Sequence, residues 1–343
     1  MPYILKDNIR IYYEYEPASN LIDSTESLVL IHGVGFDLRG WDLIVPYMTT
    51  DYNVLRYDFR GHGLTDRGVE TLNDKTFVDD LICLLTHLQI DKFHFVAHGA
   101  GSVLALFYTD RYPSRVQSSV FVSLPLFNSS DTAHKYTSYR KDLNIHNSIE
   151  AIAAHVIPNV TLYPSNSSEM IKLYEAFSKV TIDVYFEILD FYISVHDKIV
   201  GIFKENVIPT LLLTGEQDNM FPTFLSSLTA SSNPNCRYMT IYNSSNMVFY
   251  DQPLESFKQI NHFFNNKMEQ RIPVDPLLKD LHSNFLDMLN EPKIKNSPTR
   301  LEVNLINQFQ VFVDNVQIIS GWGRRNRLNT LMLDTAPLNQ MLS

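Results

Sequence analysis

Short apolar runs alternate with stretches of helical spacing along most of the chain. The run at 27–33 is continuous, which is typical of a parallel strand buried on both faces, and 92–98, 116–124 and 208–215 are further expected strands. The run at 8–16 alternates instead, and 52–63 and 236–243 complete the set of expected strands. Between them, 75–90 and 101–113 have the apolar spacing of helices. This order predicts an α/β fold with a mostly parallel sheet covered by helices on both faces.

The segment from about 126 to 206 interrupts this alternation. It has mostly helical spacing and is rich in Tyr, Phe and Ile. Ordinary core helices would give such a pattern, and so would a helical lid over a pocket. Its position after a sheet strand, where the ligand loops of open α/β sheets emerge, favours the lid.

Composition narrows the class of protein. The chain has 343 residues, of which 45% are hydrophobic, and a net charge of −10. A disordered chain is therefore excluded, and so is a generic binder of nucleic acid or anionic membrane. The chain has only two cysteines, and we find neither a signal-peptide pattern nor an apolar run of membrane-spanning length. We therefore expect a cytoplasmic protein without membrane contact. No residue spacing predicts a metal site or a cofactor, and nothing in the pattern predicts an oligomeric state.

The stretch AHGAG at 97–101 predicts a sharp turn between a buried strand and a helix. Small residues at Ala97 and Gly101 would let the strand and the helix pass closely. Gly99 at the apex accepts a positive φ without strain.

Five motifs, in this order and spacing, resemble the α/β-hydrolase fold family over roughly residues 1–268. They are LIHGVG at 30–35, YDFRGHGLTD at 57–66, AHGAG at 97–101, LLLTGEQDNMFP at 211–222 and YNSSNMVFYDQPLESF at 242–257. The resemblance implies an α/β-hydrolase fold with a helical lid, an oxyanion-hole segment in the first motif, and a nucleophile at the AHGAG turn. At the positions that match the family's catalytic triad this chain has Gly99, Asp218 and Asn246.

The chemistry implied by the resemblance is missing at two points. Gly99 has no nucleophile, and the Asn246 amide is not a base near neutral pH. We therefore expect no catalytic residues. The expected ligand-binding residues are His32, Gly33, Val34, His98, Gly99 and Ala100. Ser102 and His98 are weak candidates for a substitute catalyst, because Ser102 should lie in the first helical turn and His98 should point away from the apex. His32 is expected to be structural, His62 a turn residue and His262 a packing residue.

The chain continues beyond the hydrolase-like part. Residues 269–300 predict an amphipathic helix and a polar linker, and 301–343 predict a β-hairpin followed by a helix. This tail resembles the opening of the winged-helix DNA-binding module of bacterial transcriptional activators. The matching positions are Phe309, Val311, Val313, Asp314, Trp322, Arg324 and Arg325.

The charge of the tail differs from that of the body. From Lys293 onward the net charge is +3, which leaves the preceding residues at −13. This asymmetry is expected of a nucleic-acid effector on a separate sensor. A hairpin that packs on the body or on a second chain is the alternative.

Three functional hypotheses remain open. The first is a catalytically inactive α/β-hydrolase domain that senses a small acyl or carbonyl ligand, with DNA as a partner of the tail in a transcriptional regulator. The second is a divergent hydrolase that uses His98, Ser102 or Asp218 in a non-standard way. The third is a scaffold whose pocket is filled by side chains.

Overall fold

A computed structural model describes residues 2–20, 26–126, 130–143, 148–266, 284, 301–304, 310–313 and 316–317. The chain divides into two compact units, Met1–Asp280 and Leu281–Ser343. The following paragraphs take each unit by itself.

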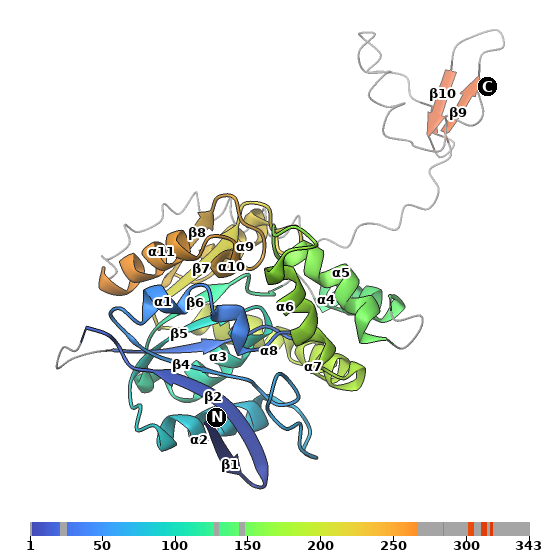
Figure 1. Cartoon of the computed structure of the whole chain (residues 1–343). Coiled ribbons are helices and arrows are strands. Elements are labelled where there is room, and N and C mark those ends of the chain that lie inside the picture. The colour runs from blue at the N-terminus through green and yellow to red at the C-terminus, as the bar shows by residue number, and fades with distance from the viewer. Residues whose placement is uncertain are drawn as a thin grey trace. The chain divides into compact units, whose positions relative to one another are not determined.

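An eight-stranded sheet forms the centre of the first unit, in the order β1-β2-β4-β3-β5-β6-β7-β8 (Figure 1). Its strands are β1 (Tyr3–Lys6), β2 (Ile9–Glu16), β3 (Ser27–Ile31), β4 (Asn53–Tyr57), β5 (Phe93–His98), β6 (Val116–Val122), β7 (Thr210–Gly215) and β8 (Cys236–Ile241). β1 pairs with β2 and β2 with β4 in antiparallel fashion, and the six strands from β4 to β8 are parallel. The predicted mostly parallel sheet is confirmed, with β1 as one strand that the sequence pattern did not reveal.

Helices cover both faces of this sheet. They are α1 (Val45–Met48), α2 (Asp74–His87), α3 (Ala100–Arg111), α8 (His196–Glu205), α9 (Thr223–Ser231), α10 (Val248–Asp251) and α11 (Pro253–Asn265), with short 3-10 turns at η1 (Leu38–Trp41) and η2 (Pro113–Arg115). α2, α3 and α8 pack together on one face, while α1 and α11 contact each other on the opposite face (Figure 1). β3 and β5 are buried, apart from partly exposed Ser27, which explains the continuous apolar sequence of β3.

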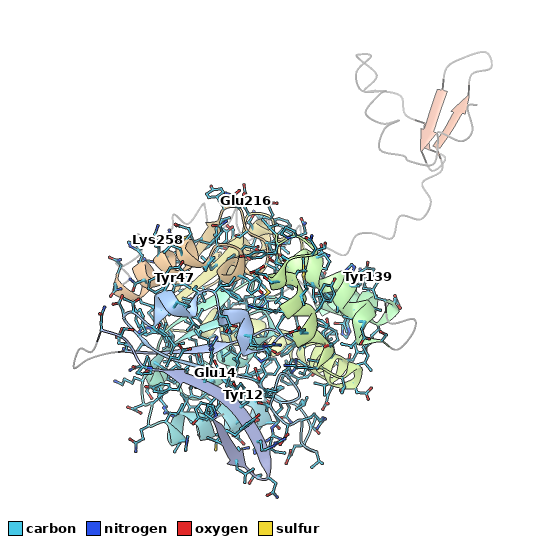
Figure 2. The ribbon with its side chains drawn as sticks, in the orientation of Figure 1. Tyr12, Glu14, Tyr47, Tyr139, Glu216 and Lys258 are labelled. Atoms are coloured by element: carbon cyan, nitrogen blue, oxygen red, sulfur yellow. The ribbon has the colours of Figure 1, made fainter. Side chains whose placement is uncertain are left out.

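Four helices lie between β6 and α8, in the segment expected to form a lid. They are α4 (Ser130–Asp142), α5 (Ile149–Val160), α6 (Ser168–Ser178) and α7 (Ile182–Ser194). α5 packs against α6, and α4 packs against α7. Tyr139 of α4 marks the outer surface of this group in Figure 2. Among the described helices, none is long and apolar enough to cross a membrane.

The second unit contains three short antiparallel strands, β9 (Leu301–Asn304), β10 (Gln310–Val313) and β11 (Val316–Gln317). Two predicted strands of the tail are therefore present, and Val311 and Val313 lie on β10. The predicted amphipathic helix and linker at 269–300 lie outside the described residues, apart from the helical position 284. Phe309, Asp314, Trp322, Arg324 and Arg325 also lie outside them, so the winged-helix resemblance stays a prediction.

The close passage of α3 over the exit of β3 can be tested with two helical glycines. A Cβ at Gly101 would lie 2.5 Å from the backbone oxygen of His32, whereas a Cβ at Gly201 in α8 would meet nothing within 4 Å. Gly101→Ala should therefore lower the free energy of unfolding by about 1–3 kcal/mol through overpacking. Gly201→Ala should raise it by about 0.5–1 kcal/mol, since alanine favours helix. Urea denaturation measures both, and equal effects of the two changes would contradict a tight crossing.

Candidate ligand site on an emptied nucleophile turn

The turn between β5 and α3 places Gly99 at its apex. Gly99 has φ 51° and ψ −121°, a conformation that strains residues with a side chain. Space is not the obstacle, because a Cβ on Gly99 would meet only the Cα of Gly33, at 3.9 Å. The expected sharp turn is present, and the atom that would attack a substrate is absent from it.

Asp218 and Asn246 lie side by side across the carboxyl edge of the sheet. Asp218 follows β7, and Asn246 precedes α10. The Asn246 Nδ2 donates to Asp218 Oδ2 at 3.0 Å, and the Ser123 hydroxyl donates to the same oxygen at 2.7 Å. The backbone N–H groups of Met220 and Phe221 donate to Oδ1, each at 2.9 Å. The carboxylate therefore holds the amide as it would hold a triad imidazole, although the amide cannot take up a proton.

His98 extends this chain of hydrogen bonds; it was expected to point away from the apex at Gly99 and to bind a ligand, and its ring reaches the side chain of Asn246. Its Nε2 lies 2.7 Å from the Asn246 Oδ1. Because that oxygen can only accept, Nε2 carries the hydrogen and Nδ1 holds the lone pair. A Cβ built on Gly33 would lie 2.8 Å from Nδ1, so this lone pair faces the backbone of the loop after β3. Because Asn246 stands where the family has its catalytic histidine, its amide oxygen needs a hydrogen-bond donor. The histidine at position 98 was the sequence signal that could have revealed this bond.

Burial keeps the His98 imidazole neutral. It lowers the pKa of His98 to about 4, although the hydrogen bond that His98 donates to Asn246 works in the opposite direction. A base with so low a pKa is poorly matched to proton abstraction near neutral pH.

His32 and His62 fix the loop that faces Gly99. His32 donates from Nδ1 to the Gly33 carbonyl at 2.9 Å and accepts the Phe59 N–H at Nε2, at 3.3 Å. His62 accepts the N–H of Gly35 at 3.0 Å. Burial lowers the pKa of both rings to about 3, so both are neutral supports. The ligand-binding role predicted for His32 is not seen. Both ring nitrogens of His32 form hydrogen bonds with the backbone, and the ring does not line the cavity described below.

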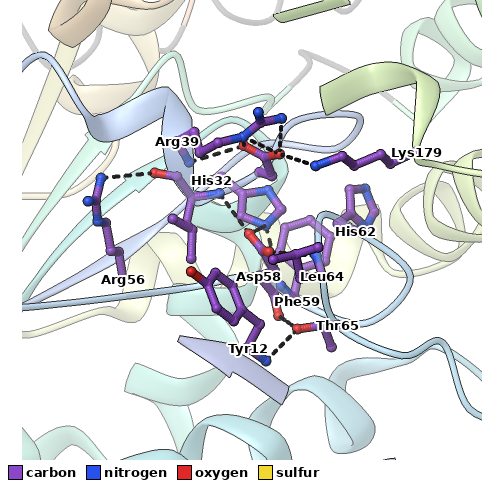
Figure 3. A network of polar contacts seen from close by, with 12 residues as sticks. Tyr12, His32, Arg39, Arg56, Asp58, Phe59, His62, Leu64, Thr65 and Lys179 are labelled. Carbon is purple, nitrogen blue, oxygen red and sulfur yellow. Dashed lines mark hydrogen bonds and ion pairs between the residues drawn. The ribbon is translucent and has the colours of Figure 1, made fainter. Parts of the chain in front are cut away.

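Asp58 braces the same loop from below, as Figure 3 shows. Its carboxylate accepts the backbone N–H groups of Leu38 at 2.7 Å and Leu64 at 2.8 Å. The Thr65 hydroxyl bonds the Asp58 carbonyl and accepts the N–H of Tyr12 in β2. The motif at 57–66 therefore has a structural role and joins two loops to strand β2.

Ser102 takes no part in the site, and His262, which was expected to be a packing residue, is instead exposed. Ser102 lies in the first turns of α3 as expected, is fully buried, and donates its hydroxyl to the Ala97 carbonyl at 2.8 Å. His262 lies within α11, where its Nδ1 is 3.0 Å from the Asn266 side-chain nitrogen. Within the described residues, no group of three or more His, Cys, Asp or Glu side chains could hold a metal ion.

Gly99 is one of the residues that line a cavity of about 100 Å³. Five of the six residues expected to bind a ligand line it, namely Gly33, Val34, His98, Gly99 and Ala100, and Asn246 joins them. The backbone N–H of Ala100 lies in the first turn of α3, where it has no acceptor within its own helix. This volume is several times the roughly 10–15 Å³ needed by one water molecule. The side chains therefore leave a cavity at this position, which argues against the hypothesis of a pocket filled by side chains.

The helices between β6 and β7 supply most of the remaining wall. It is formed mainly by Ala133, Tyr136, Thr137, Arg140, Val156, Val160, Tyr185, Leu189, Tyr192, Ile193 and His196. Tyr192 donates its hydroxyl to the Ala100 carbonyl at 2.9 Å, which ties α7 to the turn. These contacts agree with the lid interpretation. Arg140 was missed by sequence reasoning, because no motif distinguishes it from other lid residues.

Comparisons with known proteins agree with this fold. Residues 26–162 match the family model described as alpha/beta hydrolase fold. An enol-lactonase from Burkholderia xenovorans superimposes with a TM-score of 0.66 at 17% identity, covering 77% of this chain and all of that chain.

Among curated relatives, a human monoacylglycerol lipase is 24% identical over 257 residues, which are 69% of this chain and 74% of the lipase. A dihydrolipoyllysine-residue acetyltransferase component from Pseudomonas putida is 32% identical over 91 residues. The match covers only 26% of this chain and 25% of that protein.

The buried, neutral state of His98 predicts an acid-sensitive contribution to stability. Its pKa of about 4 lies below the ordinary 6.5, so between these values the unfolded chain binds a proton that the folded protein does not. The contribution is present above pH 6.5 and is lost as the pH falls toward 4. His98→Gln lacks it. Between pH 6.5 and 5, the difference in unfolding free energy should shift by about 2 kcal/mol in favour of the variant.

Urea denaturation at the two pH values measures this shift. His134→Gln, which removes an exposed histidine of α4, serves as the control. A His98→Gln difference that does not change with pH would contradict a buried neutral ring.

Proposed function

Because this chain has an α/β-hydrolase fold, we propose that its body is a catalytically inactive domain of this fold that binds a small acyl or carbonyl-containing ligand as a sensing module. One observation carries the proposal. Two of the triad positions hold a glycine and an amide, and the amide is hydrogen-bonded to both Asp218 and His98. Acyl transfer needs a nucleophile and a base that exchanges its proton, and the site offers neither in the usual place.

The retained cavity supports binding without turnover. Val34 and Ala100 line it, at positions whose backbone N–H groups form the oxyanion hole in relatives that use a nucleophile elbow. Such donors attract a carbonyl or carboxylate oxygen whether or not a nucleophile follows. A lid that contacts the turn through Tyr192 could then carry the presence of a ligand to the rest of the molecule.

A divergent hydrolase is the second candidate. It is favoured by the similarity to a lipase and an enol-lactonase and by one detail of the site. The Nδ1 lone pair of His98 faces Gly33, so it could orient a water molecule near the oxyanion segment. Its low pKa argues against efficient proton abstraction, and this candidate therefore ranks second.

Restoring the missing groups tests the first proposal. The purified chain should not hydrolyse short activated esters above background. Gly99→Ser alone and Asn246→His alone should also be inactive, since each lacks one partner. The double variant should be labelled by a serine-directed phosphonate, because position 99 has room for a side chain and Asp218 can orient a new imidazole. Gly99→Ser should cost about 1–3 kcal/mol of stability.

Two results would contradict the proposal. Ester turnover by the unmodified chain that His98→Gln abolishes would establish the divergent hydrolase instead. A folded double variant that is neither labelled nor active would show that Asn246 does not stand in the place of a catalytic histidine.

We further propose that the tail contacts DNA, so that the chain acts within a transcriptional regulator. The charge of +3 from Lys293 onward and the strands β9 and β10 support this reading. Fluorescence anisotropy should detect binding to a labelled duplex that weakens as salt rises. Changing Arg324 and Arg325 to Gln should reduce it, whereas changing the exposed Lys204 and Lys258 of the body should not. Equal losses for both pairs would point to a non-specific charge effect, and no binding at low salt would overturn the proposal.

A further inference from the structure

Arg140 is a buried cation without an acidic partner. It lies on α4, is 3% exposed and lines the cavity. The other two buried arginines of the described residues are paired: Arg56 contacts Glu14, Glu16 and Asp42, and Arg60 contacts Glu70 and Asp80. No carboxylate of the described part of the chain lies within 4.0 Å of Arg140. The stretches that flank α4, residues 127–129 and 144–147, contain no Asp or Glu in their sequence.

Two tyrosines orient the Arg140 guanidinium without neutralising it. Nη1 donates to the hydroxyl of Tyr185 at 2.8 Å, and Nη2 donates to the hydroxyl of Tyr136. The guanidinium carbon also lies 4.7 Å from the centre of the Tyr136 ring, a favourable but partial compensation. Burial raises the pKa of both phenols, so neither is an anion. The positive charge therefore remains unbalanced.

One donor of Arg140 is left over. Its Nε is buried and has no hydrogen-bond partner. A buried charge is stable only when it is paired, and a buried donor without an acceptor is unfavourable as well. The planar guanidinium presents neighbouring N–H groups that match the two oxygens of a carboxylate. Tyr185 accepts from Arg140, which leaves its own hydrogen available to a ligand oxygen.

Deepening the proposed ligand-binding function, on which this step rests, we propose that the cavity binds a small organic carboxylate whose anionic end pairs with Arg140. The remaining lid wall is largely apolar, with Ala133, Val156, Val160 and Leu189. This lining fits an aliphatic or aromatic body. A phosphate would bring more charge and more acceptors than one arginine and its tyrosines can satisfy, so the site is better matched to a carboxylate.

A purely structural Arg140 is the alternative, since its bond to Tyr185 also joins α4 to α7. The two roles differ in the ligand-free protein. A structural strut stabilises the lid, so Arg140→Met would lower the melting temperature. A cation waiting for a ligand is unfavourably buried, so Arg140→Met should leave the melting temperature unchanged or raise it.

Calorimetric titration of the full chain tests the carboxylate. The probes are two acids and their uncharged isosteres: phenylacetate with phenylacetamide, and hexanoate with hexanamide. We expect each acid to bind at least about tenfold more tightly than its amide, the size of one charge-assisted hydrogen bond. Arg140→Met should abolish this preference, and Arg140→Lys should restore only part of it because it lacks the planar pair of donors.

Lys141→Met is the matched control. It removes a positive charge from the next position on the same helix, where the side chain is half-exposed and paired with Asp190. It should leave the binding of all four compounds unchanged. A loss of acid binding equal to that of Arg140→Met would show a general charge effect and overturn the inference.

The remaining outcomes separate this inference from the proposed function. Acids and amides that bind equally, with no effect of Arg140→Met, would overturn the carboxylate and leave a ligand-binding cavity in place. Failure of all four compounds to bind, together with a lower melting temperature of Arg140→Met, would make Arg140 a strut and overturn the inference. Ester turnover by the unmodified chain would overturn the inactive function instead, while the acid preference could still be measured.

Discussion

The close approach of α3 to the exit of β3 determines where every part of the site can lie. A Cβ at Gly101 would sit 2.5 Å from the His32 carbonyl oxygen and 2.6 Å from that of Ile31. Only glycine allows this approach, and it brings Gly99 and Ala100 against the loop at Gly33 and Val34. His32, His62 and Asp58 then hold that loop through backbone hydrogen bonds. The frame of the site is thus kept by contacts that do not involve the missing nucleophile.

The positions set by backbone geometry could be predicted from the sequence. Gly99, Asp218 and Asn246 follow strands β5, β7 and β8, and the spacing of strand and turn signals along the chain is enough to align them. The lid could be located for the same reason, since a helical insertion between two parallel strands must emerge at the ligand edge of the sheet.

Side-chain partnerships were less accessible to sequence reasoning. His98 was expected to point away from the apex, but its hydrogen bond to the carbonyl oxygen of Asn246 was not foreseen, because this partnership is visible only once both side chains are placed. Arg140 could not be found at all, because its significance is the lack of a nearby carboxylate in three dimensions. His32 was assigned to the ligand because of its motif, whereas both of its ring nitrogens serve the backbone.

The amide at position 246 also changes how the site responds to its surroundings. A histidine held by a carboxylate titrates close to physiological pH and would alternate between two hydrogen-bonding patterns. An amide has one pattern at every pH, and the neighbouring His98 changes its charge only near pH 4. The hydrogen bond between His98 and Asn246 therefore keeps one arrangement above about pH 4, without the switching that a histidine at position 246 would bring.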